Sequence, residues 1–340
     1  MERDAVAGVL EQLGEPRYRM DQIVRAQRAG ARSWDDVTTL GKALRAELAG
    51  RGPLWSVVPE ERVVSVDGTV KWRLALADGS LIETVLIAHA RGRRTLCVSS
   101  QVGCALGCRF CSTGTMGFGR DLDVWEIVEQ ALIAAHEADG QDARLSNVVF
   151  MGMGEPMQNL VAVFGAIEEL HRPAPGLGIS ARQIAVSTVG WVPGIAALQE
   201  FPLPVRLAVS LHAADDETRS RMMPINQRYP IASLLSACRR YCDKTGRRVF
   251  IEYLLLDGVN DSLDDAKRLA QLLRDGRFHV NLIEYNATGG EFRASRPERR
   301  ERFLAALERA GLEASVRRSR GADVAAACGQ LVTRPVPVRA

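Results

Sequence analysis

Segments with the length and apolar character of strands alternate with segments of helical periodicity from residue 94 onward, and this alternation constrains the fold most strongly. We expect strands at 94–100, 146–151, 182–188, 204–211, 247–256, 278–285 and 314–318, and helices at 124–138, 158–171, 192–200, 230–244, 261–275, 296–311 and 322–331. Strands linked through helices pair in parallel, so the pattern predicts an α/β fold, an open or partial βα barrel. In such folds chemistry gathers at the C-terminal ends of the strands.

The first 93 residues follow a different pattern. Residues 1–50 predict three short helices, which would form a small accessory module. The Asp-Gly pairs at 67–68 and 78–79 predict hairpin turns, so residues 51–93 would form a three-stranded meander. The predicted organisation is a helical module at 1–50, a β-extension or linker at 51–93, the barrel at 94–331 and an irregular tail at 332–340.

The composition is that of an ordinary globular protein, with 46% hydrophobic and 25% charged residues among 340. No apolar run approaches the ~20 residues that a membrane-spanning helix needs, and the N-terminus lacks the apolar core of a signal peptide. These features predict a cytoplasmic protein without membrane contact. In that compartment, the seven cysteines are better suited to metal binding or catalysis than to structural disulfides.

Three of these cysteines, Cys104, Cys108 and Cys111, are spaced C-x3-C-x2-C. A [4Fe-4S] cluster is normally held by four thiolates, one per iron, so three cysteines would leave one iron open to another ligand. The spacing resembles that of radical S-adenosylmethionine (SAM) enzymes, in which SAM occupies that iron and yields a radical able to attack C–H bonds. A structural zinc site with a distant fourth ligand is the alternative, although zinc sites usually use separated C-x2-C pairs.

A glycine-rich turn, Gly152-Met153-Gly154-Glu155-Pro156, follows the second predicted strand of the barrel. Glycines let a ligand approach the backbone closely, and the Glu155 carboxylate could receive the amino group of SAM. Other polar residues fall at or just beyond the ends of predicted strands: Ser187, Ser210, His212 and Asn286. Their shared placement predicts one active site at that edge of the sheet.

Together, these motifs resemble those of the class A radical-SAM RNA methyltransferases, which methylate an adenine ring carbon in RNA. Their main branch acts at C2 of adenine in 23S ribosomal RNA and certain tRNAs, and a smaller branch acts at C8. The resemblance extends from the N-terminal module to Leu331. The motifs that carry it lie at 96–104 (Leu-Cys-Val-Ser-Ser-Gln-Val-Gly-Cys), 151–156 (Met-Gly-Met-Gly-Glu-Pro), 187–190 (Ser-Thr-Val-Gly), 210–213 (Ser-Leu-His-Ala), 223–226 (Met-Pro-Ile-Asn) and 326–331 (Ala-Ala-Cys-Gly-Gln-Leu).

The resemblance implies a role for each matching residue. Cys104, Cys108 and Cys111 would hold a [4Fe-4S] cluster. Cys328 would become an S-methylcysteine intermediate, and Cys97 would later form a transient disulfide with it. Glu83 would accept a proton or position the adenine. The residues implied in SAM binding are Gly154, Glu155, Ser187, Ser210, Leu211, His212 and Asn286.

The implied chemistry explains why two distant cysteines are needed. Adenine C2 and C8 are too electron-poor to attack the methyl group of SAM, whereas a thiolate can. In the implied ping-pong route, one SAM methylates Cys328, and a second SAM yields a 5′-deoxyadenosyl radical that takes a hydrogen atom from the S-methyl group. The carbon radical adds to the ring, which then loses an electron and a proton. Cys97 finally attacks the sulfur of Cys328 and releases the methylated base.

The chain departs from the family after the sixth barrel strand. Relatives commonly have Ile-Pro-Tyr/Trp-Asn-Pro there, whereas this chain has Ile283-Glu284-Tyr285-Asn286-Ala287. Methylation at C8 or of a different RNA therefore stays open as an alternative. A third hypothesis, a non-catalytic RNA-binding protein with a structural metal, does not explain Cys97 and Cys328. Cys238 and Cys242 repeat the C-x3-C spacing, but we interpret them as packing residues.

The implied partners are 23S rRNA, tRNA and a low-potential electron donor such as flavodoxin or ferredoxin, and the protein is expected to be a monomer. Eleven arginines and six acidic residues lie between Asn286 and the C-terminus. Because arginine suits phosphate groups, we expect this face and the N-terminal module to hold RNA. Neutralising Arg299, Arg300 and Arg302 together should then weaken RNA binding. The alternative is a solvated helix face with intrahelical ion pairs.

Overall fold

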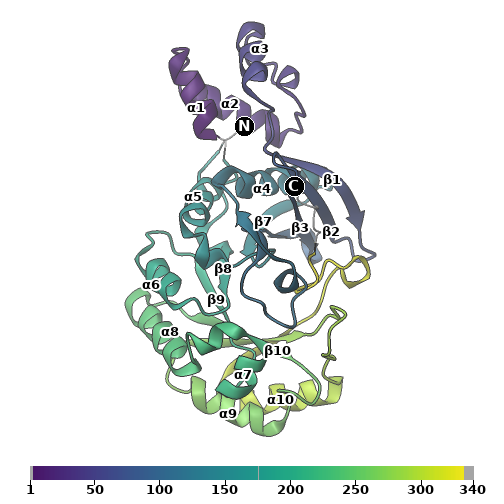
Figure 1. Cartoon of the computed structure of the whole chain (residues 1–340), viewed down its shortest axis with the longest axis vertical. Helices are drawn as coiled ribbons and strands as arrows, with labels where there is room; N and C mark the ends of the chain where they lie inside the picture. Colours follow the sequence, from purple (N-terminus) through teal and green to yellow (C-terminus); the bar gives the residue numbers. More distant parts are fainter. Residues whose placement is uncertain (1–2, 175, 333–340) are drawn as a thin grey trace.

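The computed structural model describes residues 3–174 and 176–332, and one curved sheet with the strand order β1-β2-β3-β4-β7-β8-β9-β10-β11-β12 organises them (Figure 1). Its first four strands pair antiparallel: β1 (Val57–Val64), β2 (Val70–Leu76), β3 (Leu81–Ala88) and β4 (Arg93–Cys97). From β4 onward the pairing is parallel, through β7 (Arg144–Phe150), β8 (Ile184–Thr188), β9 (Arg206–Ser210), β10 (Val249–Leu255), β11 (Phe278–Glu284) and β12 (Glu313–Arg317). The predicted α/β class and partial βα barrel are thus confirmed.

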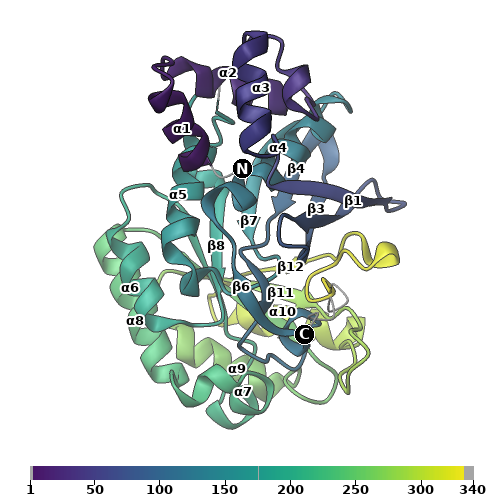
Figure 2. The same ribbon diagram turned by 45° about the horizontal axis from the view of Figure 1, so that its top comes forward.

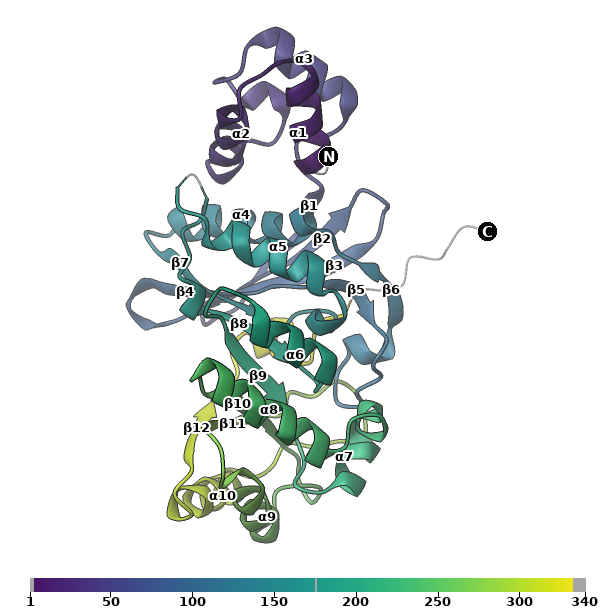
Figure 3. The ribbon, with the colours of Figure 1, turned by 90° about the vertical axis from the view of Figure 1, so that its left-hand side faces the viewer.

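Helices cover the outer face of the parallel strands (Figure 3). They are α4 (Val124–Asp139), α5 (Leu160–His171), α6 (Val192–Glu200), α8 (Ile231–Thr245), α9 (Leu263–Leu273) and α10 (Pro297–Arg309). Their buried aliphatic residues join those of the strands in one hydrophobic core. Capping boxes begin two of them, at Asp123 with Glu126 and at Ser262 with Asp265, which fixes where these helices start.

The N-terminal helices stand apart from the sheet and have a hydrophobic core of their own (Figures 1 and 2). They are α1 (Arg3–Gln12), α2 (Tyr18–Arg28), the 3-10 turn η1 (Trp34–Asp36) and α3 (Lys42–Arg51). Glu129 of α4 joins this module to the barrel, because its carboxylate accepts hydrogen bonds from the backbone N–H groups of Ser56 and Val57 and from Gln27 Nε2.

The β-meander is the continuation of the barrel sheet, since β3 pairs directly with β4. Three further elements were not expected from the sequence: the hairpin of β5 (Gln101–Cys104) and β6 (Gly117–Asp121), and helix α7 (Asp216–Met222). Within the described residues, no helix has the length and apolar character required to cross a membrane.

The helix predicted at 322–331 is wrong. The segment instead contains only a short 3-10 turn at Ala322–Val324, flanked by left-handed residues at Gly321 and Ala325. Gly329 also has a positive φ of 84°, which a helix does not accommodate. Alanine-rich composition favoured a helix, but contacts of this segment with distant strands determine its path instead. Except for Val332, the predicted tail at 332–340 lies outside the described residues.

Candidate active site

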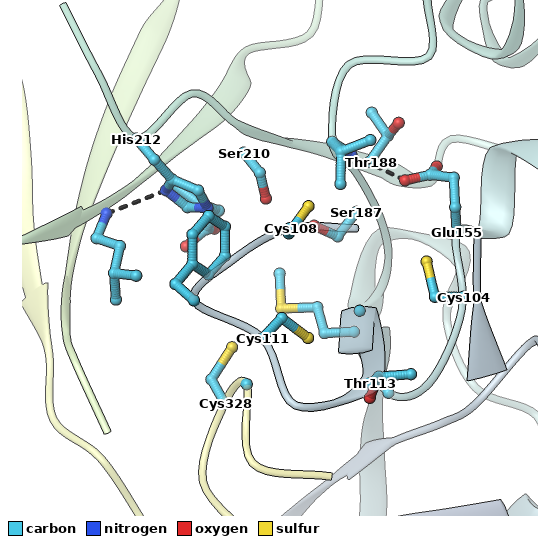
Figure 4. Close-up of a pocket in the computed structure, with 18 of the residues that line it drawn as sticks. Cys104, Cys108, Cys111, Thr113, Glu155, Ser187, Thr188, Ser210, His212 and Cys328 are labelled. Carbon is cyan, nitrogen blue, oxygen red and sulfur yellow. Dashed lines mark hydrogen bonds between the residues drawn. The ribbon is translucent and has the colours of Figure 1, made fainter. Parts of the chain in front are cut away.

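A cavity opens at the C-terminal ends of β7, β8 and β9, where the sequence predicted the active site (Figure 4). It contains about 930 Å³ of space free of protein atoms, counted out to solvent. Nine of the predicted site residues line it: Cys104, Cys108, Cys111, Gly154, Glu155, Ser187, Ser210, His212 and Cys328. Leu211, Asn286, Cys97 and Glu83 are not among its lining residues.

The loop that carries the three clustered cysteines lies between β5 and β6. Cys104 is the last residue of β5, and a backbone hydrogen bond from Cys111 N to Cys108 O turns the loop back on itself. Gly114 packs against this turn so closely that a Cβ there would lie 2.8 Å from Cys108 O. The hairpin therefore presents all three thiols to one cavity (Figure 4).

The donor set fits a [4Fe-4S] cluster. Cys104, Cys108 and Cys111 are free of disulfides. Burial, and to a smaller extent Glu155 and Cys111, raise the pKa of Cys104 to about 11. Burial, and next the thiols of Cys111 and Cys104, hold the pKa of Cys108 well above its usual value. Thiols with a raised pKa become thiolates beside a cation, and the iron of a bound cluster would supply that positive charge.

The glycine-rich turn packs tightly on the strand before the cysteine loop. Gly152 N donates to Val98 O, and a Cβ at Gly152 would lie 2.7 Å from that oxygen. Gly154 has a φ of +100°, and a Cβ at this position would lie 2.5 Å from the Cβ of Gln101. Only glycine fits either position, so this part of the cavity wall is bare backbone.

Glu155 is buried at the cavity wall with both carboxylate oxygens engaged. Oε1 accepts from Met157 N at 3.0 Å, and Oε2 accepts from Val189 N at 2.9 Å. Burial raises the pKa of Glu155 to about 7, against the effect of these hydrogen bonds. A ligand ammonium group in the cavity would favour the charged carboxylate.

His212 is a neutral hydrogen-bonding group at the opposite wall of the cavity. Its backbone is left-handed, with a φ of 58°, and its Nδ1 accepts from Leu254 N at 3.1 Å. This leaves the proton on Nε2. Burial, and next the charge of Arg219, lower the pKa of His212 to about 3. The ring of Phe110 packs edge-on against the imidazole, with 4.8 Å between the two ring centroids, and fixes its orientation.

Arg219 is fully buried beneath this wall and was not singled out from the sequence. Its guanidinium donates to the carbonyl oxygens of Val189, Ser210 and Leu211. It therefore fixes the ends of β8 and β9 relative to each other. Leu211 is itself buried behind the cavity, where its N–H donates to Glu252 O. Only its position beside Ser210 and His212 connects it with the site.

Cys328 reaches the cavity from the C-terminal segment, 217 residues after Cys111 in the chain. Two hydrogen bonds join this segment to the cysteine loop: Ser112 N donates to Gly329 O, and Thr113 Oγ1 donates to Leu331 O at 2.6 Å. Asn286 Nδ2 donates to Cys328 O at 3.3 Å, so Asn286 supports the backbone of Cys328 instead of lining the cavity. The residue as a whole is exposed, but burial of its thiol against the cavity wall raises the pKa of Cys328 to about 11, and Arg317 lowers it.

Cys97 lies at the end of β4, close enough to Cys328 for the charges of the two thiols to interact. Burial, followed by Cys328, raises the pKa of Cys97 to about 12, whereas Arg317 lowers it. The fold has therefore brought together two cysteines separated by 231 positions. Cys238 and Cys242, in contrast, are buried in the core on α8, as expected of packing residues.

Glu83 is buried on β3, outside the cavity. Its carboxylate pairs with Lys71 at 3.1 Å and accepts from Val332 N at 2.9 Å. In this arrangement it anchors the end of the C-terminal segment, four residues beyond Cys328. Its role as a proton acceptor or in adenine positioning stays a prediction, because the carboxylate would have to leave these partners to reach the cavity.

Comparison with known proteins agrees with this site. Residues 98–273 match the model of the radical SAM superfamily. The chain is 48% identical to the probable dual-specificity RNA methyltransferase RlmN of Heliobacterium modesticaldum, over 96% of this chain and 87% of that protein. It is 47% identical to the RlmN of an Anaeromyxobacter species, over 98% and 90%.

Among solved structures, a radical SAM methyltransferase from Sphaerobacter thermophilus superposes with a TM-score of 0.92 at 48% identity, with 96% of each chain covered. These matches decide between the two metal alternatives in favour of a [4Fe-4S] cluster with SAM. The chain therefore belongs to the RlmN family of radical-SAM RNA methyltransferases.

Proposed function

We propose that this protein methylates C2 of an adenine in 23S rRNA and in tRNA, through a methylated Cys328. The observation that carries the proposal is that Cys328 lines the same cavity as the three cysteines of the β5–β6 loop. A protein that only bound RNA would need neither this thiol nor its link to the cysteine loop. The names of the relatives, dual-specificity RNA methyltransferases, support the substrate class.

The chain's own residues would act first in binding. Cys104, Cys108 and Cys111 would hold the cluster, which supplies the electron for reductive cleavage of SAM. The carboxylate of Glu155 would receive the amino group of SAM. The Nε2–H of His212 would donate to the same ligand, and the backbone of Gly152 and Gly154 would allow its close approach.

Cys328 would then accept the methyl group of a first SAM. Its thiolate sulfur bonds to the methyl carbon as the carbon–sulfonium bond breaks, and S-adenosylhomocysteine leaves. The thiolate must form against a pKa raised by burial, and the nearby guanidinium of Arg317 favours it. Because Cys328 lines the cavity of the cluster cysteines, its methyl group would lie where reductive cleavage of a second SAM supplies hydrogen abstraction. The resulting methylene carbon would bond to C2 of adenine, and the adduct would pass one electron to the oxidised cluster and lose the C2 proton.

Cys97 would complete the cycle. Its sulfur would bond to that of Cys328 as the bond from Cys328 to the methyl-derived carbon breaks, and that carbon would take up a proton. A cellular thiol would then reduce the disulfide. We further propose that the protein acts as a monomer in the cytoplasm and receives electrons from a flavodoxin or ferredoxin.

The proposal is tested by mass spectrometry of nucleosides from 23S rRNA and tRNA after anaerobic turnover with methyl-labelled SAM. Wild type should label 2-methyladenosine, and Cys328→Ala should label no nucleoside. Label in 8-methyladenosine would assign the protein to the other branch of the family. The absence of labelled nucleoside from cluster-loaded wild type that still cleaves SAM would contradict RNA methylation.

A further inference from the structure

A second cavity lies inside the barrel and borders the first. Inward-facing residues of β4 and β7 to β12 line it, and it shares Met151, Glu252, Ile283 and Cys328 with the first cavity. It contains about 1520 Å³ of space free of protein atoms, counted out to solvent. Cys328 therefore lines two neighbouring cavities. The proposed binding of SAM gives a function to the first cavity and leaves the second without one.

The wall of this second cavity is basic. Arg206, Arg317, Arg318 and Arg320 line it, and Glu252 is the single acidic residue among its described lining residues. Arg206 is the first residue of β9. Arg317 is the last residue of β12, and Arg318 and Arg320 lie just after it. Guanidinium groups gathered around an open space are suited to phosphate, which they bind through paired N–H donors.

Glu252 lies at the border of the two cavities and has an unused acceptor. The residue is only 3% exposed, and its Oε1 accepts from Asn281 Nδ2 at 2.8 Å. Its Oε2 has no hydrogen-bond partner in the described part of the chain, and Arg317 Nη1 lies 3.7 Å away. Buried carboxylate oxygens are normally hydrogen-bonded, so this oxygen calls for a donor from a bound molecule.

We propose that the second cavity receives the target adenosine, turned out of its RNA strand, and that Glu252 Oε2 accepts a hydrogen bond from its exocyclic amine. This inference rests on the proposed function and adds the element of substrate recognition. Enzymes that act on a base take it out of the stack and bind its Watson–Crick edge. Here Arg206 and Arg318 hold the flanking phosphate, because Arg317 and Arg320 already pair with Glu252 and Asp67, and Cys328 lies beside the ring.

The proposal makes the exocyclic amine the group by which adenine is recognised. A purine without this amine carries only hydrogen at C6, so Glu252 Oε2 would stay without a hydrogen bond. A hydrogen bond to a buried charged group contributes about 1.5–3 kcal/mol, so loss of the amine should weaken binding at least about tenfold.

The test uses adenosine 5′-monophosphate (AMP) and purine riboside 5′-monophosphate, which lacks the amine. Each is titrated by NMR into cluster-loaded protein whose first cavity is saturated with S-adenosylhomocysteine. AMP should bind about tenfold more tightly than the purine analogue. Equal affinities, or displacement of AMP by S-adenosylhomocysteine, would overturn the proposal. This comparison needs no variant and therefore no assumption about folding.

Variants locate the contact. Glu252→Gln keeps an acceptor for Asn281 but turns an NH₂ donor toward the cavity, so AMP should lose about tenfold in affinity and the purine analogue should bind as before. Equal losses for both nucleotides would show a merely structural role. Arg318→Gln should weaken both nucleotides equally, whereas Arg302→Gln on α10, the matched control, should weaken neither.

The outcomes separate this inference from the proposed function. If wild type labels 2-methyladenosine in RNA but does not discriminate between the two nucleotides, only the role of Glu252 is wrong. If wild type discriminates between the nucleotides but labels no RNA, the pocket stands and the assigned reaction is wrong.

Discussion

The cysteine loop at 104–111 and the C-terminal segment at 317–332 bring thiols to the same cavity by different means. The loop places three thiols within eight residues, between two paired strands. The segment brings one thiol and has no regular structure between β12 and Cys328 apart from one 3-10 turn. A local hairpin is sufficient to shape the loop, whereas the segment depends on contacts with distant parts of the chain.

Those contacts come largely from the β-meander. Asp323 accepts from Ser65 Oγ and from Val66 N, Lys71 Nζ donates to Ala325 O, and Asp67 accepts from Gly321 N. Figure 2 shows the C-terminal segment alongside these strands. The meander therefore does more than extend the sheet, because it holds the segment that carries Cys328 over the cavity.

The largest expected effect comes from the loop. Cys104→Ala should lose the cluster and with it all SAM cleavage, because two thiolates are too few to hold a cubane. Iron analysis and the absorbance of the anaerobically purified protein measure this loss. Cys238→Ala, on α8, is the matched control. It should keep its iron and lose about 1–2 kcal/mol of folding free energy. Equal iron loss in both variants would contradict the assignment of the loop.

Cys328→Ala should separate the function of the C-terminal segment from that of the cysteine loop. It should retain iron and the ability to bind SAM, and yet lose RNA methylation by at least about a thousandfold, since the covalent nucleophile is absent. The experiment measures transfer of labelled methyl groups to RNA and the iron content of the same protein sample. Residual methylation near the wild-type rate would show that the segment does not carry the methyl group.

Cys97→Ala should fail at a later step than Cys328→Ala. The RNA should become attached to the protein but not leave it, because the second thiol is missing. Denaturing gel electrophoresis with labelled RNA detects the adduct, and its size should be unchanged by reducing agent. Free methylated RNA in normal yield would instead place the resolving thiol elsewhere.

Asp323→Ala should loosen the segment without disturbing the loop. Loss of the hydrogen bonds from Ser65 and Val66 should lower methylation about three- to tenfold and speed alkylation of Cys328, while iron content stays constant. Asp275→Ala, in the loop between α9 and β11, is the control. Unchanged alkylation of Cys328 in Asp323→Ala would mean that the meander does not restrain the segment.

The smallest expected effect concerns RNA binding by arginines. Arg299 pairs with Asp257 and Asp261, and Arg300 pairs with Glu284, so much of the charge of α10 is already neutralised. Arg318→Gln should therefore reduce the salt dependence of RNA binding by about one phosphate contact, and Arg299→Gln by less. Filter binding at several salt concentrations measures the slopes. A larger change for Arg299→Gln would favour the original prediction for α10.

The sequence predicted most of the parallel strands and their helices, because apolar periodicity reports which faces become buried. It failed at 322–331, where alanine content favours a helix but Gly321, Gly329 and side-chain contacts with the meander prevail. It also passed over Arg219 and Glu252. One arginine among the polar residues of α7, or one glutamate within the apolar strand β10, is a weak signal until the structure shows that it is buried beside a cavity.

What the sequence determined by itself is the chemistry that neighbouring residues can perform: a cysteine loop for a cluster, a glycine turn for close approach and a βα alternation for the sheet. Only the tertiary structure decided which distant groups meet. It places Cys97 near Cys328, ties Glu83 to Val332 and leaves Glu252 Oε2, beside Arg317, without a hydrogen bond between two cavities. The reason is physical, because spacing along the chain fixes local geometry, whereas long-range proximity follows from how the whole sheet curves and is packed.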